Sequence, residues 1–191
     1  IQNKSKLEYD YNLINLLTKK NKNIKILEFG CGWGHWAKFM QSKSISIKTC
    51  EFSKIRNDYL RSNGLENFKE LNEIKEKFDL IYSEEVLEHL SNPLDELYKL
   101  SHLLKPGGYM LHRFPSSLFF ELKLKFRYTP KKDCAHPLEH INIFNKTCFE
   151  KIANFLNLKI INLNKIYDLD LVKKIKFLKN RLLFNFIILK K

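Results

Sequence analysis

The chain has 191 residues with a hydrophobic content of 44%, which suits one folded domain with a sizeable core and argues against disorder. Its formal net charge is +13, but 29 of its 34 basic residues are Lys, and it contains 18 Asn. This Lys- and Asn-rich, Arg-poor composition indicates a coding bias rather than a nucleic-acid-binding face, which would favour Arg for bidentate contacts.

Apolar spacing and helix-breaking residues predict alternating helices and strands. A leading amphipathic helix is expected around Leu7, Ile14 and Leu17. The further expected elements are strand Lys25–Phe29, helix His35–Ser42, strand Ser46–Phe52, helix Lys54–Ser62, short strand Asn67–Glu70, strand Phe78–Tyr82, a helix from Pro93 to about Leu104, strand Tyr109–Phe114, helix Lys146–Asn157, strand Leu158–Lys165 and strand Leu182–Leu189.

This order predicts an α/β fold, in which a doubly wound, mostly parallel seven-stranded sheet has helices on both faces. We expect a single domain over residues 1–191. The stretch at about 115–145 shows little periodicity and is interpreted as a lid or acceptor segment.

No apolar run reaches the 18 or so residues that span a bilayer, and the first residues lack the apolar core of a signal peptide. The four Cys form no CxxC pair, which is typical of inert thiols in a reducing cytoplasm. The apolar stretch Phe184–Leu189 is interpreted as a last buried strand, with a membrane-touching basic tail as the alternative. We therefore expect a cytoplasmic protein with no membrane span.

Three of the six glycines, Gly30, Gly32 and Gly34, directly follow the first predicted strand. Glycine permits positive φ and close approach of a ligand, and the helix beyond offers unpaired N–H groups. The spacing is GxGxG. A dinucleotide fingerprint needs glycine where His35 stands, and no Lys-Ser/Thr pair follows to make a phosphate-binding P-loop. The loop predicts a nucleotide-type ligand at the carboxyl ends of the strands.

Glu51 stands at the end of the second predicted strand, 21 residues after Gly30. A carboxylate in that place can accept hydrogen bonds from both ribose hydroxyls of a bound nucleoside. The alternative is a solvated surface side chain.

With these residues in view, the region from about Lys25 to Lys165 resembles the class I S-adenosylmethionine-dependent methyltransferases. The resemblance is carried, in order, by the segments ILEFGCGWG, CEFS, FDLIYSEEVLEHL and LKPGGYML. It implies a Rossmann-like methyltransferase fold and S-adenosylmethionine as the cofactor. The cofactor-binding residues that it implies are Glu28, Gly30, Cys31, Gly32, Gly34, Glu51, Phe52, Ser83 and Glu84.

Glu85, Glu88 and His89 are spaced i, i+3, i+4, so on a helical turn they would share one face. Two carboxylates with one or two imidazoles would suit Mg²⁺, Mn²⁺ or Zn²⁺. This ExxEH pattern is similar to that of ubiquinone-pathway O-methyltransferases and of small-RNA 3′-end 2′-O-methyltransferases. The resemblance implies a divalent metal that gathers the acceptor hydroxyl, with His140 or His136 completing its site. The alternative is a metal-free member of the superfamily.

Without a metal, His140 is the first candidate for a general base and His136 the second. The alternative is that these histidines only tie the lid to the sheet. His89, His112 and Arg113 are expected to face the acceptor, where Arg113 could hold a phosphate or carboxylate. For Arg113 a surface salt bridge is the alternative.

The stretch Leu118–Lys132 mixes aromatic and basic residues, and we interpret it as an amphipathic lid over a small-molecule pocket. The alternative is a surface that contacts RNA by stacking and charge. Trp33 and Trp36 are expected to pack in the core, with stacking on the substrate as the alternative.

We therefore expect a methyltransferase that acts on a hydroxyl of a small molecule, such as a sugar or nucleotide-sugar of surface glycan biosynthesis. This acceptor rests on the resemblance of the segment PLEHINIF to glycan-tailoring enzymes. The alternatives are a metal-dependent RNA 2′-O-methyltransferase and a catalytically inactive binding or scaffold protein of the same fold.

Overall fold

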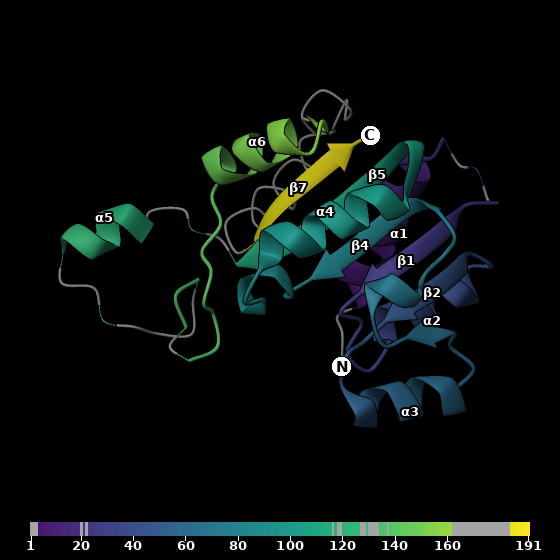
Figure 1. Cartoon of the computed structure of the whole chain (residues 1–191). Helices are drawn as coiled ribbons and strands as arrows, with labels where there is room; N and C mark the ends of the chain where they lie inside the picture. Colours follow the sequence, from purple (N-terminus) through teal and green to yellow (C-terminus); the bar gives the residue numbers. More distant parts are fainter. Residues whose placement is uncertain are drawn as a thin grey trace.

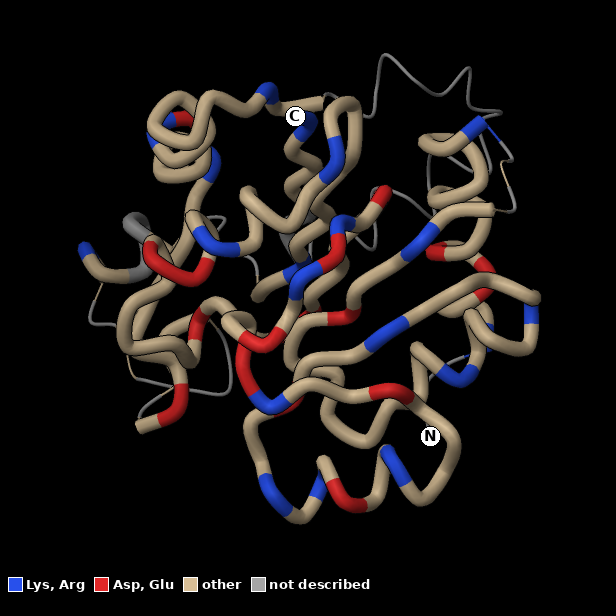
Figure 2. The backbone as a smooth tube through the Cα atoms, turned by 45° about the vertical axis from the view of Figure 1, so that its right-hand side comes forward, with Lys and Arg blue, Asp and Glu red and all other residues tan. Residues whose placement is uncertain are grey.

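The computed structural model describes residues 4–19, 21, 23–115, 117, 120–126, 129, 134–136, 138–161 and 184–191. Among these residues, no helix combines the length and the apolar character needed to cross a lipid bilayer. Lys and Arg are distributed over the described elements with Asp and Glu between them (Figure 2).

A seven-stranded sheet in the order β3-β2-β1-β4-β5-β7-β6 forms the centre of the molecule (Figure 1). Its strands are β1 (Lys25–Phe29), β2 (Ser46–Cys50), β3 (Asn67–Phe68), β4 (Phe78–Glu84), β5 (Leu104–Pro115), β6 (Lys159–Ile160) and β7 (Phe184–Lys190). The first five strands pair in parallel, whereas β7 runs antiparallel to both β5 and β6. The predicted fold class is confirmed.

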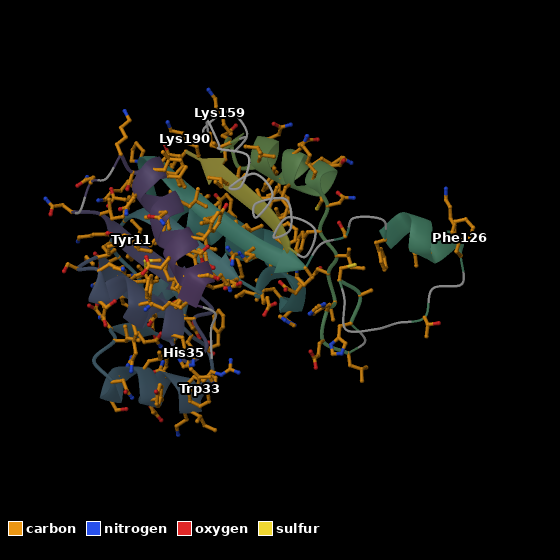
Figure 3. All side chains as sticks on the ribbon, turned by 180° about the vertical axis from the view of Figure 1, so that it is seen from behind. Tyr11, Trp33, His35, Phe126, Lys159 and Lys190 are labelled. Atoms are coloured by element: carbon orange, nitrogen blue, oxygen red, sulfur yellow. The ribbon has the colours of Figure 1, made fainter. Side chains whose placement is uncertain are left out.

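Helices cover both faces of this sheet. On one face lie α1 (Lys4–Leu17), α2 (His35–Ser42) and α3 (Lys54–Ser62), and on the other α4 (Pro93–Leu103) and α6 (Lys146–Phe155). Figure 1 shows α4 and α6 in front of the sheet, and Figure 3 shows α1 and α2 from behind. The helix α5 (Phe120–Lys125) lies apart from the sheet (Figure 1).

Each face buries its own apolar cluster. Leu13, Trp36 and Leu60 pack with Tyr82 on the face of α1 to α3. Phe78, Leu97 and Phe149 belong to the cluster on the opposite face. Strands that are buried on both faces are expected to be apolar throughout, as β1 and β4 largely are.

The helix starts follow from local chemistry. The Asn92 side chain accepts the N–H of Asp95, and Pro93 occupies the first turn of α4. Asn145 likewise accepts the N–H of Cys148 at the start of α6. These caps stand where the sequence predicts helix starts.

Several boundaries differ from the prediction. The second strand ends at Cys50 because Glu51 turns to accept the N–H of Ser53. The fifth strand begins at Leu104, which pairs with Phe78 before a register shift. The sixth strand is shorter, over Lys159–Ile160, and residues 162–165 and 182–183 of the predicted strands lie outside the described residues. The helix α5 was not predicted.

The last strand supports the buried-strand interpretation of the apolar tail. Ile187, Ile188 and Leu189 are buried, and β7 pairs with a strand on either side. Their apolar side chains therefore pack in the interior of the protein.

Candidate functional site

The carboxyl ends of four parallel strands meet at one edge of the sheet. β1, β2, β4 and β5 run in the same direction, and the strand order reverses between β1 and β4. In doubly wound sheets ligands bind outside the carboxyl ends at such a reversal. The loop Gly30–Gly34 follows β1, Glu51 follows β2, and Glu84 ends β4, so the predicted cofactor residues share this edge.

The loop between β1 and α2 is shaped by its glycines, whose φ values are +70° at Gly30, +58° at Gly32 and +69° at Gly34. A Cβ at Gly30 would lie 2.4 Å from a methyl carbon of Val86, and one at Gly34 would lie 2.5 Å from a methyl carbon of Leu60. A Cβ at Gly32 would meet no atom within 4 Å. Packing therefore requires glycine at two positions, and at the third the space is open to a ligand.

Glu51 joins the end of β2 to this loop. Its Oε2 accepts the N–H of Gly32 at 2.9 Å, and its Oε1 accepts the N–H of Ser53 at 2.9 Å. Arg56 Nη1 lies 3.8 Å from Oε1. Each carboxylate oxygen can accept more than one hydrogen bond, so Glu51 retains capacity for ribose hydroxyls. The structure thus brings two predicted cofactor residues together.

Aromatic side chains stand beside the loop. Phe52 is half exposed and meets Phe29 edge-on, with ring centroids 5.5 Å apart. Trp36 is buried, as predicted. Trp33 is 44% exposed and packs edge-on against Tyr59 of α3, so the prediction of a core position for it is wrong. The ring of Trp33 lies beside α3, near His35 (Figure 3).

Two predicted cofactor residues, Glu28 of β1 and Cys31 of the loop, are buried. Burial, together with the nearby Glu84 carboxylate, raises the pKa of Glu28 well above its ordinary value, although the Ala37 N–H opposes the shift. Among the described residues, Glu28 Oε2 has no hydrogen-bond partner. Burial also raises the pKa of the Cys31 thiol. In both cases burial disfavours the charged form of the group.

Ser83 and His112 form a buried pair on neighbouring strands. The Ser83 hydroxyl oxygen and His112 Nδ1 are 2.7 Å apart, and the His112 ring lies 6.4 Å from that of Phe149. Burial lowers the pKa of His112 to about 3. The sequence predicted that His112 faces the acceptor. The structure instead encloses this side chain completely, because β5 directs it into the core under α6.

Charged groups are concentrated at the ends of β4 and β5. Arg113 donates to Asp10 Oδ1 at 2.6 Å and to Glu84 Oε1 at 3.3 Å. The Tyr82 hydroxyl lies 3.2 Å from Asp10 Oδ2 and 3.1 Å from Glu84 Oε2. Lys6 of α1 forms an ion pair with Glu84. Arg113 therefore takes part in salt bridges, as one interpretation held, but these are buried rather than on the surface.

Sequence reasoning gave no role to Asp10 or Lys6. A signal for Asp10 was nevertheless present, because the residue stands three positions after Leu7 and four before Ile14. All three lie on the buried face of α1. A charged residue at an apolar-face position of an amphipathic helix needs a partner in the interior.

Glu88, His89 and His140 form a cluster whose potential ligand atoms all lie within 4.8 Å of one another. The backbone brings His140 there, because the Glu88 carbonyl accepts the N–H groups of Ile141 at 2.9 Å and Asn142 at 3.1 Å. The rings of His89 and His140 have centroids 4.9 Å apart. The segment that contains His140 is thus hydrogen-bonded to the 3₁₀ turn Leu87–His89, which follows β4.

The chemistry of this cluster fits a divalent cation. Glu88 is 1% exposed, and neither carboxyl oxygen makes a hydrogen bond to another described residue. Burial raises the pKa of Glu88 to about 7. A buried carboxyl group that bonds to no other described residue, beside two imidazoles, is a donor set that Zn²⁺ or Mn²⁺ accepts.

Two other predicted ligands are placed differently. Glu85 is exposed with φ +52° and precedes the short 3₁₀ turn Leu87–His89. The helical spacing rule therefore does not apply to it, and the structure does not bring it into the cluster. His136 Nδ1 lies 2.8 Å from Glu139 Oε2, and its ring is 5.7 Å from that of His140, so His136 adjoins the cluster.

Comparison with known protein families gives one match that covers most of the chain. A family model described as "methyltransferase domain" matches residues 3–163. This span includes the glycine loop, Glu51 and the cluster of Glu88, His89 and His140.

Curated relatives match over a shorter region. The ubiquinone biosynthesis O-methyltransferase of Alkalilimnicola ehrlichii is 29% identical over 113 residues, which cover 51% of this chain and 46% of that protein. The enzyme of the same name from Dinoroseobacter shibae is 31% identical over 100 residues, or 47% of this chain and 40% of the relative. The chain thus matches less than half the length of these relatives.

Solved structures share the fold. An S-adenosylmethionine dependent methyltransferase from Mesorhizobium loti superposes with a TM-score of 0.65 and 13% identity, covering 97% of this chain and 100% of the other. A magnesium protoporphyrin IX methyltransferase from Synechocystis, solved with bound S-adenosylmethionine, gives a TM-score of 0.62 and 12% identity over 95% and 77% of the two chains. At such low identity these likenesses concern the architecture alone.

Proposed function

The chain belongs to the methyltransferase domain family, and we propose from this premise that it transfers a methyl group from S-adenosylmethionine to a hydroxyl oxygen of a small molecule. The observation that carries the proposal is the pairing of Glu51 with Gly32. It combines a carboxylate suited to ribose with a backbone that a ligand can approach.

The residues present fit this cofactor. The bound cofactor supplies an activated methyl group on a sulfonium, so the protein mainly has to bind and orient the reactants. Glu51 would accept the ribose hydroxyls, and Gly32 would leave room for the methionine part. Glu84 is proposed as a neighbour of the cofactor at the end of β4, and Ser83, whose side chain is buried against His112, as a neighbour through its backbone.

For the acceptor side we propose that a ring nitrogen of His140 takes the proton of the hydroxyl, with His136 as the second candidate base. A positioned imidazole typically contributes about 10²–10⁴-fold. The curated relatives are named O-methyltransferases, which supports oxygen as the acceptor atom. Their match covers too little of each protein to indicate their substrate here.

The cluster of Glu88, His89 and His140 supports a metal-assisted form of the same reaction. These three side chains would hold a divalent cation, which when bound lowers the pKa of a coordinated hydroxyl. His136 would then be the nearest imidazole outside the cluster, 5.7 Å from His140 between ring centroids.

We propose a sugar or nucleotide-sugar of surface glycan biosynthesis as the acceptor and the cytoplasm as the location. Both rest on the sequence, the first on residues 137–144. The second candidate function is RNA 2′-O-methylation, which the metal-type cluster favours. Among the described residues, Lys and Arg are interspersed with Asp and Glu (Figure 2), which supports the small-molecule acceptor.

Calorimetric titration with S-adenosylhomocysteine tests the cofactor site. The wild type is expected to bind with micromolar affinity, and Glu51→Ala is expected to lose most of it. The exposed Glu150 of α6 provides a matched control, since Glu150→Ala should bind like the wild type. A folded wild type that does not bind would refute the enzyme and favour the scaffold alternative.

The acceptor is tested by incubating the protein and S-adenosylmethionine with a panel of nucleotide-sugars or with a short RNA oligonucleotide, with and without EDTA. A nucleotide-sugar that gains one methyl group on a sugar oxygen supports the proposal. Methylation of the RNA alone, abolished by EDTA, would establish the second candidate instead. A product methylated on nitrogen or carbon would exclude both.

A further inference from the structure

Asp10 of α1 accepts hydrogen bonds from three other elements. Its Oδ2 lies 3.2 Å from Trp36 Nε1 of α2 and 3.2 Å from the Tyr82 hydroxyl of β4, and its Oδ1 lies 2.6 Å from Arg113 Nη2 of β5. The Asp10 side chain is fully buried. The Asp10 carboxylate therefore makes hydrogen bonds both to helix α2 and to strands β4 and β5 of the sheet.

Two partners of Asp10, Trp36 and Arg113, connect it to different parts of the edge where the predicted cofactor residues lie. Trp36 stands two residues after Gly34, and its ring stacks on Tyr82 with centroids 4.0 Å apart and planes within 1°. Arg113 also bonds Glu84 at the end of β4. Asp10 thus contacts the helix directly behind the glycine loop and, through Arg113, the carboxylate at the neighbouring strand end.

Stability is a poor explanation for this arrangement. Burial raises the pKa of Asp10 and outweighs the opposing effect of Arg113, while Glu84 adds to the rise and Lys6 and Trp36 reduce it. Removing a carboxylate and a guanidinium from water costs nearly what their attraction returns, so apolar replacements are often equally stable. The geometry that the pair fixes is the better explanation.

We propose that Asp10 is a positioning residue for cofactor binding, which acts through Trp36 and Arg113 to hold the glycine loop and Glu84 in their binding geometry. The inference rests on the proposed function in one respect, that the cofactor binds at the Gly30–Gly34 loop. It adds a residue of α1, outside the glycine loop and the strand ends, to the determinants of affinity.

A double variant separates positioning from stability. Asp10→Asn leaves Arg113 without its closest anion and should lower both the melting temperature and the affinity for S-adenosylhomocysteine, the latter at least tenfold. Asp10→Asn combined with Arg113→Met also removes the buried guanidinium, which has lost its shorter ion pair. The melting temperature should recover, whereas the affinity should stay at least tenfold below that of the wild type. Glu84 then lacks the guanidinium of Arg113, and the amide that replaces the Asp10 carboxylate has a single oxygen left to accept from Trp36 or Tyr82.

The matched control is Asp79→Asn. Asp79 forms a 2.7 Å ion pair with Lys105 at the opposite end of the sheet, so its loss should leave the affinity unchanged. Both quantities are measured on the full chain, by calorimetry and by thermal unfolding. All titrations are made below the lowest melting transition of the set.

The inference is overturned if Asp10→Asn binds like the wild type, or if the double variant recovers affinity together with stability. Should Asp10→Asn fail to fold, Trp36→Phe removes only the indole N–H and keeps a stacking ring. A few-fold weaker affinity in that folded variant supports the inference, and an unchanged affinity overturns it. Absence of binding by the folded wild type is a separate result, which refutes the proposed function itself.

Discussion

The Gly32 N–H and the Glu51 carboxylate are joined by a 2.9 Å hydrogen bond between the glycine loop after β1 and the end of β2. The bond fixes the direction of the carboxylate through a backbone group, and a second N–H, that of Ser53, fixes its other oxygen. A side chain held in this way loses little further freedom when it binds a ligand.

Substitution of Glu51 by Gln should weaken S-adenosylhomocysteine binding about 10- to 100-fold, because hydrogen bonds to a charged group contribute about 1.5–3 kcal/mol. The amide keeps the size of the side chain, but its NH₂ group cannot accept the N–H of Gly32 or Ser53, so the melting temperature should also fall, by the loss of one such hydrogen bond. Calorimetry and thermal unfolding check the two effects. Equal affinity of the variant and the wild type would show that the charge of Glu51 is not used in binding.

Alanine at Gly30 should mainly reduce stability, whereas alanine at Gly32 should mainly reduce cofactor affinity. Gly30→Ala places a Cβ 2.4 Å from Val86 and should reduce stability strongly. Gly32→Ala meets open space and carries mainly the cost of its positive φ, about 1–2 kcal/mol. It should remain folded but bind S-adenosylhomocysteine at least tenfold more weakly. Wild-type affinity in Gly32→Ala would indicate that the cofactor does not approach this backbone.

Acid should destabilise the protein through His112. Burial lowers the folded-state pKa of His112 to about 3, whereas an unfolded imidazole titrates near 6.5. Above pH 6.5 neither state binds a proton at this group. Between pH 6.5 and 3 only the unfolded state does, so stability falls by up to about 1.4 kcal/mol per pH unit.

The measurement is the melting temperature of the wild type and His112→Gln from pH 7.5 to 4.5. The variant should show a flatter decline. Buried acids with raised pKa values, such as Glu28, shift stability in the opposite direction, but they do so in both proteins. His102→Gln, at an exposed histidine of α4, should behave like the wild type. Parallel curves for all three proteins would contradict the prediction.

The histidine cluster should bind one equivalent of Zn²⁺ or Mn²⁺ after removal of metals with EDTA. His140→Ala should weaken this binding about tenfold or more, in line with the sensitivity of metal sites to their supporting residues. Glu85→Ala is the matched control, because Glu85 belongs to the same ExxEH pattern but lies outside the cluster. Equal losses in both variants would place the metal elsewhere.

Much of the fold could be predicted because its signals are local. The helix that begins at Pro93 has its cap and its proline within a few residues, and the strand Lys25–Phe29 is a short apolar run ended by glycine. The order of such elements determines a parallel sheet. In such a sheet the Gly30–Gly34 loop and Glu51 lie at the same edge, so their proximity could be predicted before any contact was seen.

The charged interior could not be predicted in the same way. The partner of Asp10, Arg113, lies 103 residues along the chain, and only the packing of α1 on the sheet brings them together. Glu85 shows the complementary error. Its spacing suggests a helix, but the chain takes a left-handed turn there before the 3₁₀ segment begins. Spacing rules hold only where the backbone is regular.

The place of β7 between β5 and β6 has a consequence for how the sheet is assembled during synthesis. The part Tyr109–Pro115 of β5 pairs with residues about 70 to 80 positions further along the chain, from Tyr109 with Lys190 to Pro115 with Phe184. Until residues 184–190 have left the ribosome, β5 lacks its described partner β7 on this edge, which other chains can then join. Truncation before residue 184 should therefore yield self-associating protein, detectable by light scattering. Monodisperse truncated protein would show that the edge is protected by other means.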